Sequence, residues 1–161
     1  MQKRFKTVGV GGTFDELHKG HRSLLMKAFE VGEHVMIGMS SDAFVQRLKK
    51  PHVTARYEQR LKEVRSFLNE KGLLKKARII PIDDAFGGVL LSHGPIEALV
   101  VSRETEPTAR SINEKRKERE MPQLKIIVID MVPSENDSAI STTRIREGEI
   151  DREGHLLKQK S

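Results

Sequence analysis

Residues 11–25, GGTFDELHKGHRSLL, place two histidines at the start of a leucine-rich helical pattern. His18 and His21 could bind a metal, bind a phosphate or pack as ordinary side chains. A catalytic zinc site needs a third protein ligand. The sequence supplies no cysteine, no H-E-x-x-H pattern and no obvious third histidine nearby. Metal binding is therefore the weakest interpretation, whereas packing stays open for either histidine taken alone.

Phosphate binding accounts for more of this stretch at once. Gly11 and Gly12 would let backbone N–H groups come close to a ligand. The expected helix start near Gly20 and His21 would present N–H donors and the positive end of the helix dipole, and imidazoles add directed donors. The missing side chain at Gly20 would also let adenine or a phosphate approach the backbone. Because the pattern is neither a Walker loop nor G-x-G-x-x-G, it predicts an anion site of another type.

A second anion site is predicted near the C-terminus. The stretch AISTTRIREGE, residues 139–149, places three hydroxyls and then two arginines where the last helix should begin. These residues are Ser141, Thr142, Thr143, Arg144 and Arg146. Hydroxyls beside the unpaired N–H groups of a helix start can hold an anion. An ordinary helix cap is the alternative for this stretch alone, but together with residues 11–21 the phosphate interpretation is favoured.

Short apolar, β-branched runs alternate with helical patterns along the chain. Nearly continuous apolar character is typical of strands buried on both faces of a parallel sheet. We expect strands at residues 6–10, 34–39, 77–82, 98–102 and 125–132. We expect helices at residues 21–31, 55–70, 86–93, 106–119 and 141–148, with Thr54 as the cap of the second.

This alternation predicts an α/β fold: a single-domain, Rossmann-like, doubly wound parallel sheet of about five strands with flanking helices. Ligands of such sheets lie outside the carboxyl ends of the strands, near the point where the strand order reverses. If residues 6–10 form the first, central strand, residues 11–21 lie at that point. We expect residues 1–161 to form one domain, with the last ten or so residues as a loose tail.

The composition narrows the class of partner. The chain has 161 residues, 32% of them charged, and a net charge of +6, which favours anionic partners. Aromatic residues are only 4%, so platforms for base stacking are scarce and nucleic acid is not expected as a partner. The sequence shows no long uncharged apolar run and no signal-peptide pattern. We therefore expect a cytoplasmic protein without a membrane partner, with a monomer slightly favoured over an oligomer.

The two anion motifs together resemble those of the nucleotidyltransferase superfamily that shares its H-x-G-H motif with class I aminoacyl-tRNA synthetases. The motif here is His18–Lys19–Gly20–His21, and ISTTRIR resembles the family pattern I-S-S-T-x-I-R, with Thr142 in place of a serine. The further segments LKKPH, YEQRLKEVRSFL, IEALVVSRET and INEKRKERE resemble archaeal-type phosphopantetheine adenylyltransferases. Glu120 stands where that family has glycine, at an expected helix end.

The resemblance implies adenylyl transfer from ATP to 4′-phosphopantetheine, which yields dephospho-coenzyme A and pyrophosphate. It implies that His21, Lys50 and Thr13 are catalytic. It assigns ATP binding to Gly12, Thr13, His18, Gly20, His21, Arg103, Ser141, Thr142 and Thr143, and acceptor binding to Thr13, Lys49 and Lys50. Mg²⁺ would be carried with ATP, without a dedicated metal site on the protein.

Two other interpretations of the motifs remain open. One keeps the fold and changes the acceptor, as in glycerol-3-phosphate or choline-phosphate cytidylyltransferases and in flavin or nicotinamide-nucleotide adenylyltransferases. The other is a nucleotide-binding module without turnover. The middle segments from LKKPH to INEKRKERE favour phosphopantetheine as the acceptor. The presence of both anion motifs favours an active enzyme.

Overall fold

The computed structural model describes residues 4–48, 53–84, 96–130, 145 and 151–155. Within these residues, five parallel strands form one sheet in the order β3–β2–β1–β4–β5. The strands are β1 (Phe5–Gly12), β2 (Gly32–Ser40), β3 (Ala77–Ile82), β4 (Ala98–Ser102) and β5 (Lys125–Ile129). The first strand therefore lies at the centre, and the strand order reverses between β1 and β4.

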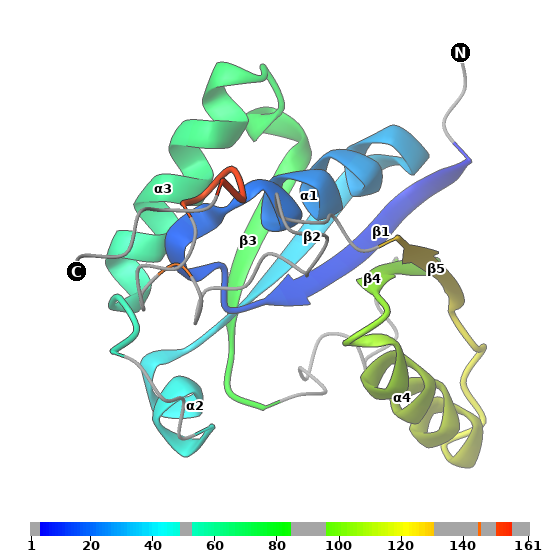
Figure 1. Cartoon of the computed structure of the whole chain (residues 1–161). Helices are drawn as coiled ribbons and strands as arrows, with labels where there is room; N and C mark the ends of the chain where they lie inside the picture. The colour runs from blue at the N-terminus through cyan, green and yellow to red at the C-terminus, as the bar shows by residue number, and fades with distance from the viewer. Residues whose placement is uncertain (1–3, 49–52, 85–95, 131–144, 146–150, 156–161) are drawn as a thin grey trace.

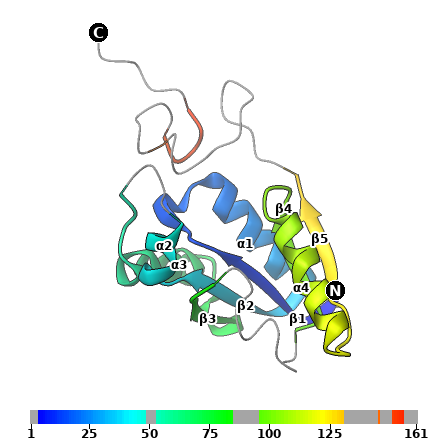
Figure 2. The ribbon, with the colours of Figure 1, turned by 90° about the horizontal axis from the view of Figure 1, so that it is seen from below.

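Helices cover both faces of this sheet (Figures 1 and 2). α1 (Lys19–Val31) and α3 (Tyr57–Glu70) pack on one face, and α4 (Glu106–Glu118) packs on the other. The shorter elements are η1 (Asp15–Leu17), α2 (Asp42–Arg47) and η2 (Leu74–Lys76). The predicted α/β architecture is thus confirmed. None of the described helices is long and apolar enough to cross a membrane.

Each face of the sheet has its own hydrophobic core, because alternate side chains of a strand point to opposite faces. Val35, Ile37 and Met39 of β2 face α1 and α3, whereas Met36 lies in the core on the α4 side. α1 buries its predicted apolar face, which is Leu24, Leu25, Ala28 and Phe29. Burial on both faces explains why the strands read as nearly continuous apolar runs.

The predicted elements agree closely with the structure where the chain is described. All five expected strands are present, and the helices expected at residues 21–31 and 106–119 are α1 and α4. Glu120, which stands where the resembling family has glycine, lies just beyond α4 with a positive φ of 57°. Glycine is favoured at such a position because it has no Cβ to strain. The helices expected at residues 86–93 and 141–148 lie outside the described residues.

The start of α3 differs from the prediction. The expected cap, Thr54, lies before the helix, which begins at Tyr57 without a side-chain cap. Instead, the backbone N–H of Tyr57 donates to Oδ1 of Asp42 in α2 at 2.7 Å. A carboxylate at a helix start satisfies an unpaired N–H group and interacts favourably with the helix dipole. The prediction was wrong because this acceptor lies 15 positions away, where helical periodicity gives no information.

Arg60 of α3 is completely buried and ties the carboxyl ends of two strands to the start of this helix. Its Nη1 donates to the carbonyls of Thr13, just after β1, at 2.9 Å and of Ser40, the end of β2, at 2.7 Å. Its Nε donates to the carbonyl of Ala55 at 2.8 Å, and its Nη2 pairs with Asp42 at 3.1 Å. Buried carbonyls need donors, and a buried guanidinium needs acceptors. Arg60 therefore holds the edge of the sheet from which the candidate site residues project.

Replacement of Arg60 by Met should lower the free energy of unfolding by about 3–5 kcal/mol, because the apolar stem is kept while the buried carbonyls lose their donor. Urea denaturation followed by circular dichroism measures this change. Arg65→Met is the matched control, because Arg65 is an exposed arginine on the same helix and should contribute little. Equal losses in the two variants would contradict the role given to Arg60.

Candidate active site

The candidate site lies outside the carboxyl ends of the central strands. β1 leads into residues 13–21, β2 ends at Ser40, and β4 ends at Ser102, followed by Arg103. In Figure 1 the dark blue chain turns from the arrowhead of β1 back towards α1. Because the strand order reverses between β1 and β4, this edge is where doubly wound sheets bind their ligands. The position predicted for residues 11–21 is confirmed.

His18 and His21 cap α1 reciprocally. Nδ1 of His18 accepts a hydrogen bond from the N–H of His21, and Nδ1 of His21 accepts one from the N–H of His18, both at 3.3 Å. The two rings stack with their centroids 3.7 Å apart. Because both Nδ1 atoms are acceptors, the proton of each neutral ring lies on Nε2. The cap thus orients two Nε2–H donors at the start of a helix.

The glycine of the H-x-G-H motif makes room for this cap. A Cβ at Gly20 would lie 2.9 Å from Cε1 and 3.0 Å from Nδ1 of His18. Any side chain there would displace the ring that caps the helix. Packing against His18 therefore gives Gly20 a structural role, while the approach of a ligand to its backbone stays a prediction.

Burial keeps His18 neutral. The residue is only 6% exposed, and this desolvation, together with the positive charges of Arg22 and Arg152, lowers the pKa of His18 to about 4. A neutral ring can accept the N–H of His21 through Nδ1 and donate through Nε2. At neutral pH, His18 therefore offers a directed donor but no positive charge.

The loop between β1 and α1 has an unusual backbone. Phe14 (φ 55°) and Glu16 (φ 62°) both adopt the left-handed conformation, which costs a residue with a Cβ about 1–2 kcal/mol. Phe14 is fully buried and packs edge-on against His21, with ring centroids 5.4 Å apart. The buried Asp15 accepts the N–H of Ala55 at 3.2 Å. These contacts offset the backbone strain and direct the loop into α1.

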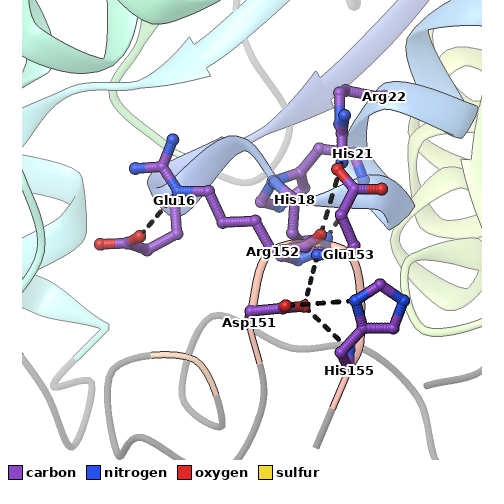
Figure 3. A network of polar contacts seen from close by, with 8 residues as sticks. All are labelled: Glu16, His18, His21, Arg22, Asp151, Arg152, Glu153 and His155. Carbon is purple, nitrogen blue, oxygen red and sulfur yellow. Dashed lines mark hydrogen bonds and ion pairs between the residues drawn. The ribbon is translucent and has the colours of Figure 1, made fainter. Parts of the chain in front are cut away.

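Residues 151–155, here called the C-terminal turn, lie against the start of α1 and beside α3 (Figures 1 and 3). The carbonyl of Arg152 accepts the N–H of Lys19, the first residue of α1, at 2.8 Å. The turn also makes ion pairs with η1, α3 and α1, which are Arg152–Glu16, Arg152–Glu63 and Glu153–Arg22. The described part of the C-terminal tail is therefore held by specific contacts.

The structure brings five of the predicted site residues together at this edge, namely Gly12, Thr13, His18, Gly20 and His21. Oγ1 of Thr13 donates to Oγ of Ser40 at 3.3 Å. Arg103 lies at the end of β4, exposed, and pairs with Asp130 at 3.4 Å. Lys49, Lys50, Ser141, Thr142 and Thr143 lie outside the described residues. In the part of the chain that is described, no cluster of three or more histidines, aspartates or glutamates could hold a metal ion.

Sequence reasoning missed two arginines that organise the site. Arg60 had a usable signal, because Arg60, Val64 and Leu68 are four residues apart and share the buried face of α3. An arginine within an apolar helical stripe indicates a buried guanidinium with several acceptors. Arg152 had no such signal, because its partner Glu16 is 136 positions away in the sequence.

Comparison with known proteins identifies the family. A family model described as cytidylyltransferase-like matches residues 10–148. A phosphopantetheine adenylyltransferase from Methanothermobacter thermautotrophicus is 45% identical over 159 residues, covering 99% of this chain and 94% of the relative. Another from Pyrococcus horikoshii is also 45% identical and covers 99% of both chains. The chain belongs to the cytidylyltransferase-like family and, within it, to the phosphopantetheine adenylyltransferases.

Solved structures agree with this family assignment at the level of the fold. A protein of unknown function from Archaeoglobus fulgidus superposes with a TM-score of 0.66 at 32% identity, over 76% of this chain and 97% of that chain. The pantoate–β-alanine ligase of Francisella tularensis has a TM-score of 0.58 at 17% identity, over 88% of this chain and 65% of that one. The resemblance to phosphopantetheine adenylyltransferases, first drawn from the sequence motifs, is confirmed.

Because the folded adenylyltransferase holds His18 neutral, acid should destabilise it. The unfolded chain takes up this proton near pH 6.5 and the folded protein only near pH 4, so the stabilisation is complete above pH 6.5 and is lost as the pH falls towards 4. The loss between pH 7 and pH 4.5 should be about 2–3 kcal/mol, measured by urea denaturation at both values.

His18→Asn is the control for this acid effect. Asparagine also caps helix starts but does not titrate, so the variant should lose less stability between the two pH values. An equal loss in the variant and the unmodified protein would show that His18 is not the buried neutral group.

Proposed function

We propose that this chain transfers the adenylyl group of ATP to 4′-phosphopantetheine, giving dephospho-coenzyme A and pyrophosphate in coenzyme A biosynthesis. The observation that carries the proposal is the reciprocal histidine cap, which orients two donors at the carboxyl edge of the central strand. The family adds the acceptor, since relatives 45% identical over nearly the whole chain are phosphopantetheine adenylyltransferases.

The reaction depends on positioning more than on proton transfer. An oxygen of the acceptor phosphate attacks the α-phosphorus of ATP, and the bond to the leaving pyrophosphate breaks. The second pKa of a phosphate monoester is about 6, so the nucleophile is largely ionised at neutral pH and needs no general base. Catalysis then consists of aligning the two substrates and placing donors where charge develops. A site of imidazole N–H donors at a helix start fits that requirement.

We propose that His21 donates a hydrogen bond to the α-phosphoryl group of ATP as it is transferred. His21 is half-buried, whereas His18 is buried, so the ring of His21 is the more accessible of the two. The cap and the stacked ring of His18 hold its Nε2–H in place before substrate arrives. A donor that needs no rearrangement during the reaction stabilises the transition state more than the bound substrate. His18 would contact the ATP phosphates and keep His21 in orientation.

The remaining assignments follow from the resemblance. Gly12, Thr13 and Gly20 would lie beside the reacting phosphates, and Arg103 would line the adenine side. Two further groups of residues lie outside the described ranges. Of these, Lys49 and Lys50 would bind the acceptor phosphate, and Ser141, Thr142 and Thr143 would bind the β- and γ-phosphates. A cytoplasmic location, a monomeric state and the absence of a nucleic-acid partner stay predictions.

Mg²⁺ would reach the site with ATP. Among the described residues, no group of three or more histidines, aspartates or glutamates is placed to hold a metal ion, and we expect ATP itself to carry the ion. Mg²⁺ commonly binds through substrate phosphates and water. The ion would therefore screen the triphosphate while the histidines act on the α-phosphoryl group.

The purified protein should release pyrophosphate when ATP, 4′-phosphopantetheine and Mg²⁺ are all present, and omission of the acceptor should stop the release. A coupled pyrophosphate assay, with dephospho-coenzyme A identified by mass spectrometry, tests this. The same assay should be run with the competing substrate pairs. These are CTP with glycerol-3-phosphate or choline phosphate, and ATP with flavin mononucleotide or nicotinamide mononucleotide. Better turnover with one of these pairs would reassign the acceptor, and ATP binding without any turnover would indicate a binding module.

His21→Gln should lower kcat by about 10²–10³, the usual effect of losing one preorganised donor. ATP affinity and the thermal midpoint should stay nearly unchanged, because glutamine at this helix position can still accept the N–H of His18. His21→Ala should lower kcat similarly and cost about 1 kcal/mol of stability as well, since the cap is lost. His34→Gln, an exposed histidine on β2, is the control. Near-normal turnover in His21→Gln would refute the assigned role.

A further inference from the structure

The C-terminal turn has a shape of its own. Oδ1 of Asp151 accepts the N–H groups of Glu153 at 2.9 Å and of His155 at 2.8 Å. The N–H of Asp151 donates to the carbonyl of His155 at 2.9 Å, and Gly154 has a positive φ of 84°. The turn is thus closed by hydrogen bonds within five residues. Figure 3 shows it facing the start of α1, with the Arg152 side chain extending to Glu16 and the Glu153 carboxylate beside Arg22.

Polar contacts hold this turn on the protein. Nε of Arg152 donates to Glu16 at 3.0 Å, and a terminal nitrogen of the same guanidinium donates to Glu63 at 3.2 Å. A surface pocket of about 370 Å³ lies beside these pairs and is lined by Leu17, Phe67 and the charged residues of the turn and α3. Within the described residues, the turn is attached by these ion pairs and by the hydrogen bond from the N–H of Lys19 to the carbonyl of Arg152.

These contacts reach the residues on either side of His18, whose ring holds the proposed catalytic residue His21 in place. Glu16 has a left-handed backbone and lies two residues before His18. The N–H of Lys19 belongs to the first turn of α1, where N–H groups lack partners within the helix, and the carbonyl of Arg152 accepts it. One residue therefore supports both sides of His18, through its side chain on Glu16 and through its backbone on Lys19.

We propose that Arg152 is a positioning residue for adenylyl transfer. By bridging Glu16 of η1 to Glu63 of α3, it clamps the loop that ends at His18, and the reciprocal cap passes this constraint to His21. The guanidinium of Arg152 is bonded to Glu16 and Glu63, so we assign it an effect through this loop and not a contact with substrate. This inference rests on the proposed function for its effect on the rate, whereas the clamp itself can be measured without substrate.

Arg152→Ala should lower kcat about 10- to 100-fold while KM for ATP stays nearly constant, because a misplaced donor matters most in the transition state. Arg152→Lys should recover part of the rate, since lysine keeps the charge but lacks the forked guanidinium that reaches two carboxylates. Glu16→Gln combined with Arg152→Ala should lower kcat less than the product of the single effects, because the two residues act as a unit. Arg110→Ala is the matched control, an exposed arginine paired with Glu106 on α4.

The titration of His18 followed by NMR reports on the clamp without substrate. The titratable and charged groups around His18 are His21 and Arg22 of α1, Arg152 and Glu153 of the turn, and Glu16 and Glu63, which Arg152 binds. Loss of the Arg152 cation and greater exposure of the ring both favour protonation. In Arg152→Ala the midpoint should therefore rise from about 4 towards 6.5.

Two results would overturn the positioning role of Arg152. One is a His18 midpoint in Arg152→Ala equal to that of the unmodified protein. The other is a lower thermal midpoint with unchanged kcat at a temperature where the variant is folded, because that pattern belongs to a purely structural contact. Absence of turnover in the unmodified protein would instead refute the proposed function, and the His18 titration would still decide whether the clamp exists.

Discussion

The guanidinium of Arg60 lies inside the protein, and the segments that form the site are attached to it. It holds the carbonyls of Thr13 and Ser40, at the carboxyl ends of two neighbouring strands, together with the carbonyl of Ala55. Removing a guanidinium from water costs a large free energy unless acceptors surround it. The folded chain meets that requirement only when both strand ends and the start of α3 are in place. The same hydrogen bonds of Arg60 therefore complete the edge of the sheet and position the segments of the site.

Between this edge and the two histidines, successive residues of the loop and of the start of α1 position the histidine rings. Phe14 and Glu16 direct the backbone into α1 through conformations that an isolated loop would rarely adopt. The reciprocal cap then sets the histidine rings, and Gly20 leaves the space that the cap needs. The cap and the glycine contact are local, whereas the loop before them is supported by Ala55 at Asp15 and by Arg152 at Glu16. The site thus has its donors placed before any ligand binds, at the expense of local backbone strain.

Much of the fold follows from local sequence pattern. The strands could be predicted because burial on both faces leaves long apolar runs, and α1 because its apolar face repeats at helical spacing. The carboxyl-edge position of the H-x-G-H motif followed from the central place of β1. These features depend on residues close together in the chain, so periodicity reports them.

The parts that could not be predicted depend on distant partners. Asp42, rather than the nearby Thr54, serves the start of α3, and Arg152 reaches back to Glu16 across 136 positions. Ion pairs of this kind leave no periodic trace, because any surface carboxylate could be the partner. The reciprocal use of both histidines was hidden for another reason: a histidine at the start of a helix is equally compatible with binding a ligand and with capping, and only the ring orientation distinguishes them.

The reciprocal cap has a consequence for how such motifs persist. A chain that stopped turning over substrate would still lose a helix-capping hydrogen bond if either histidine changed to a residue that cannot accept an N–H, and a side chain at the intervening glycine would displace the ring of His18. Substitutions at these three positions would lower the stability of the fold, so they would be selected against even after selection for catalysis had ended. In this chain, H-x-G-H caps the start of α1, and Gly20 leaves room for the capping ring. The proposed nucleotide chemistry would therefore use a turn that the fold also needs for its stability.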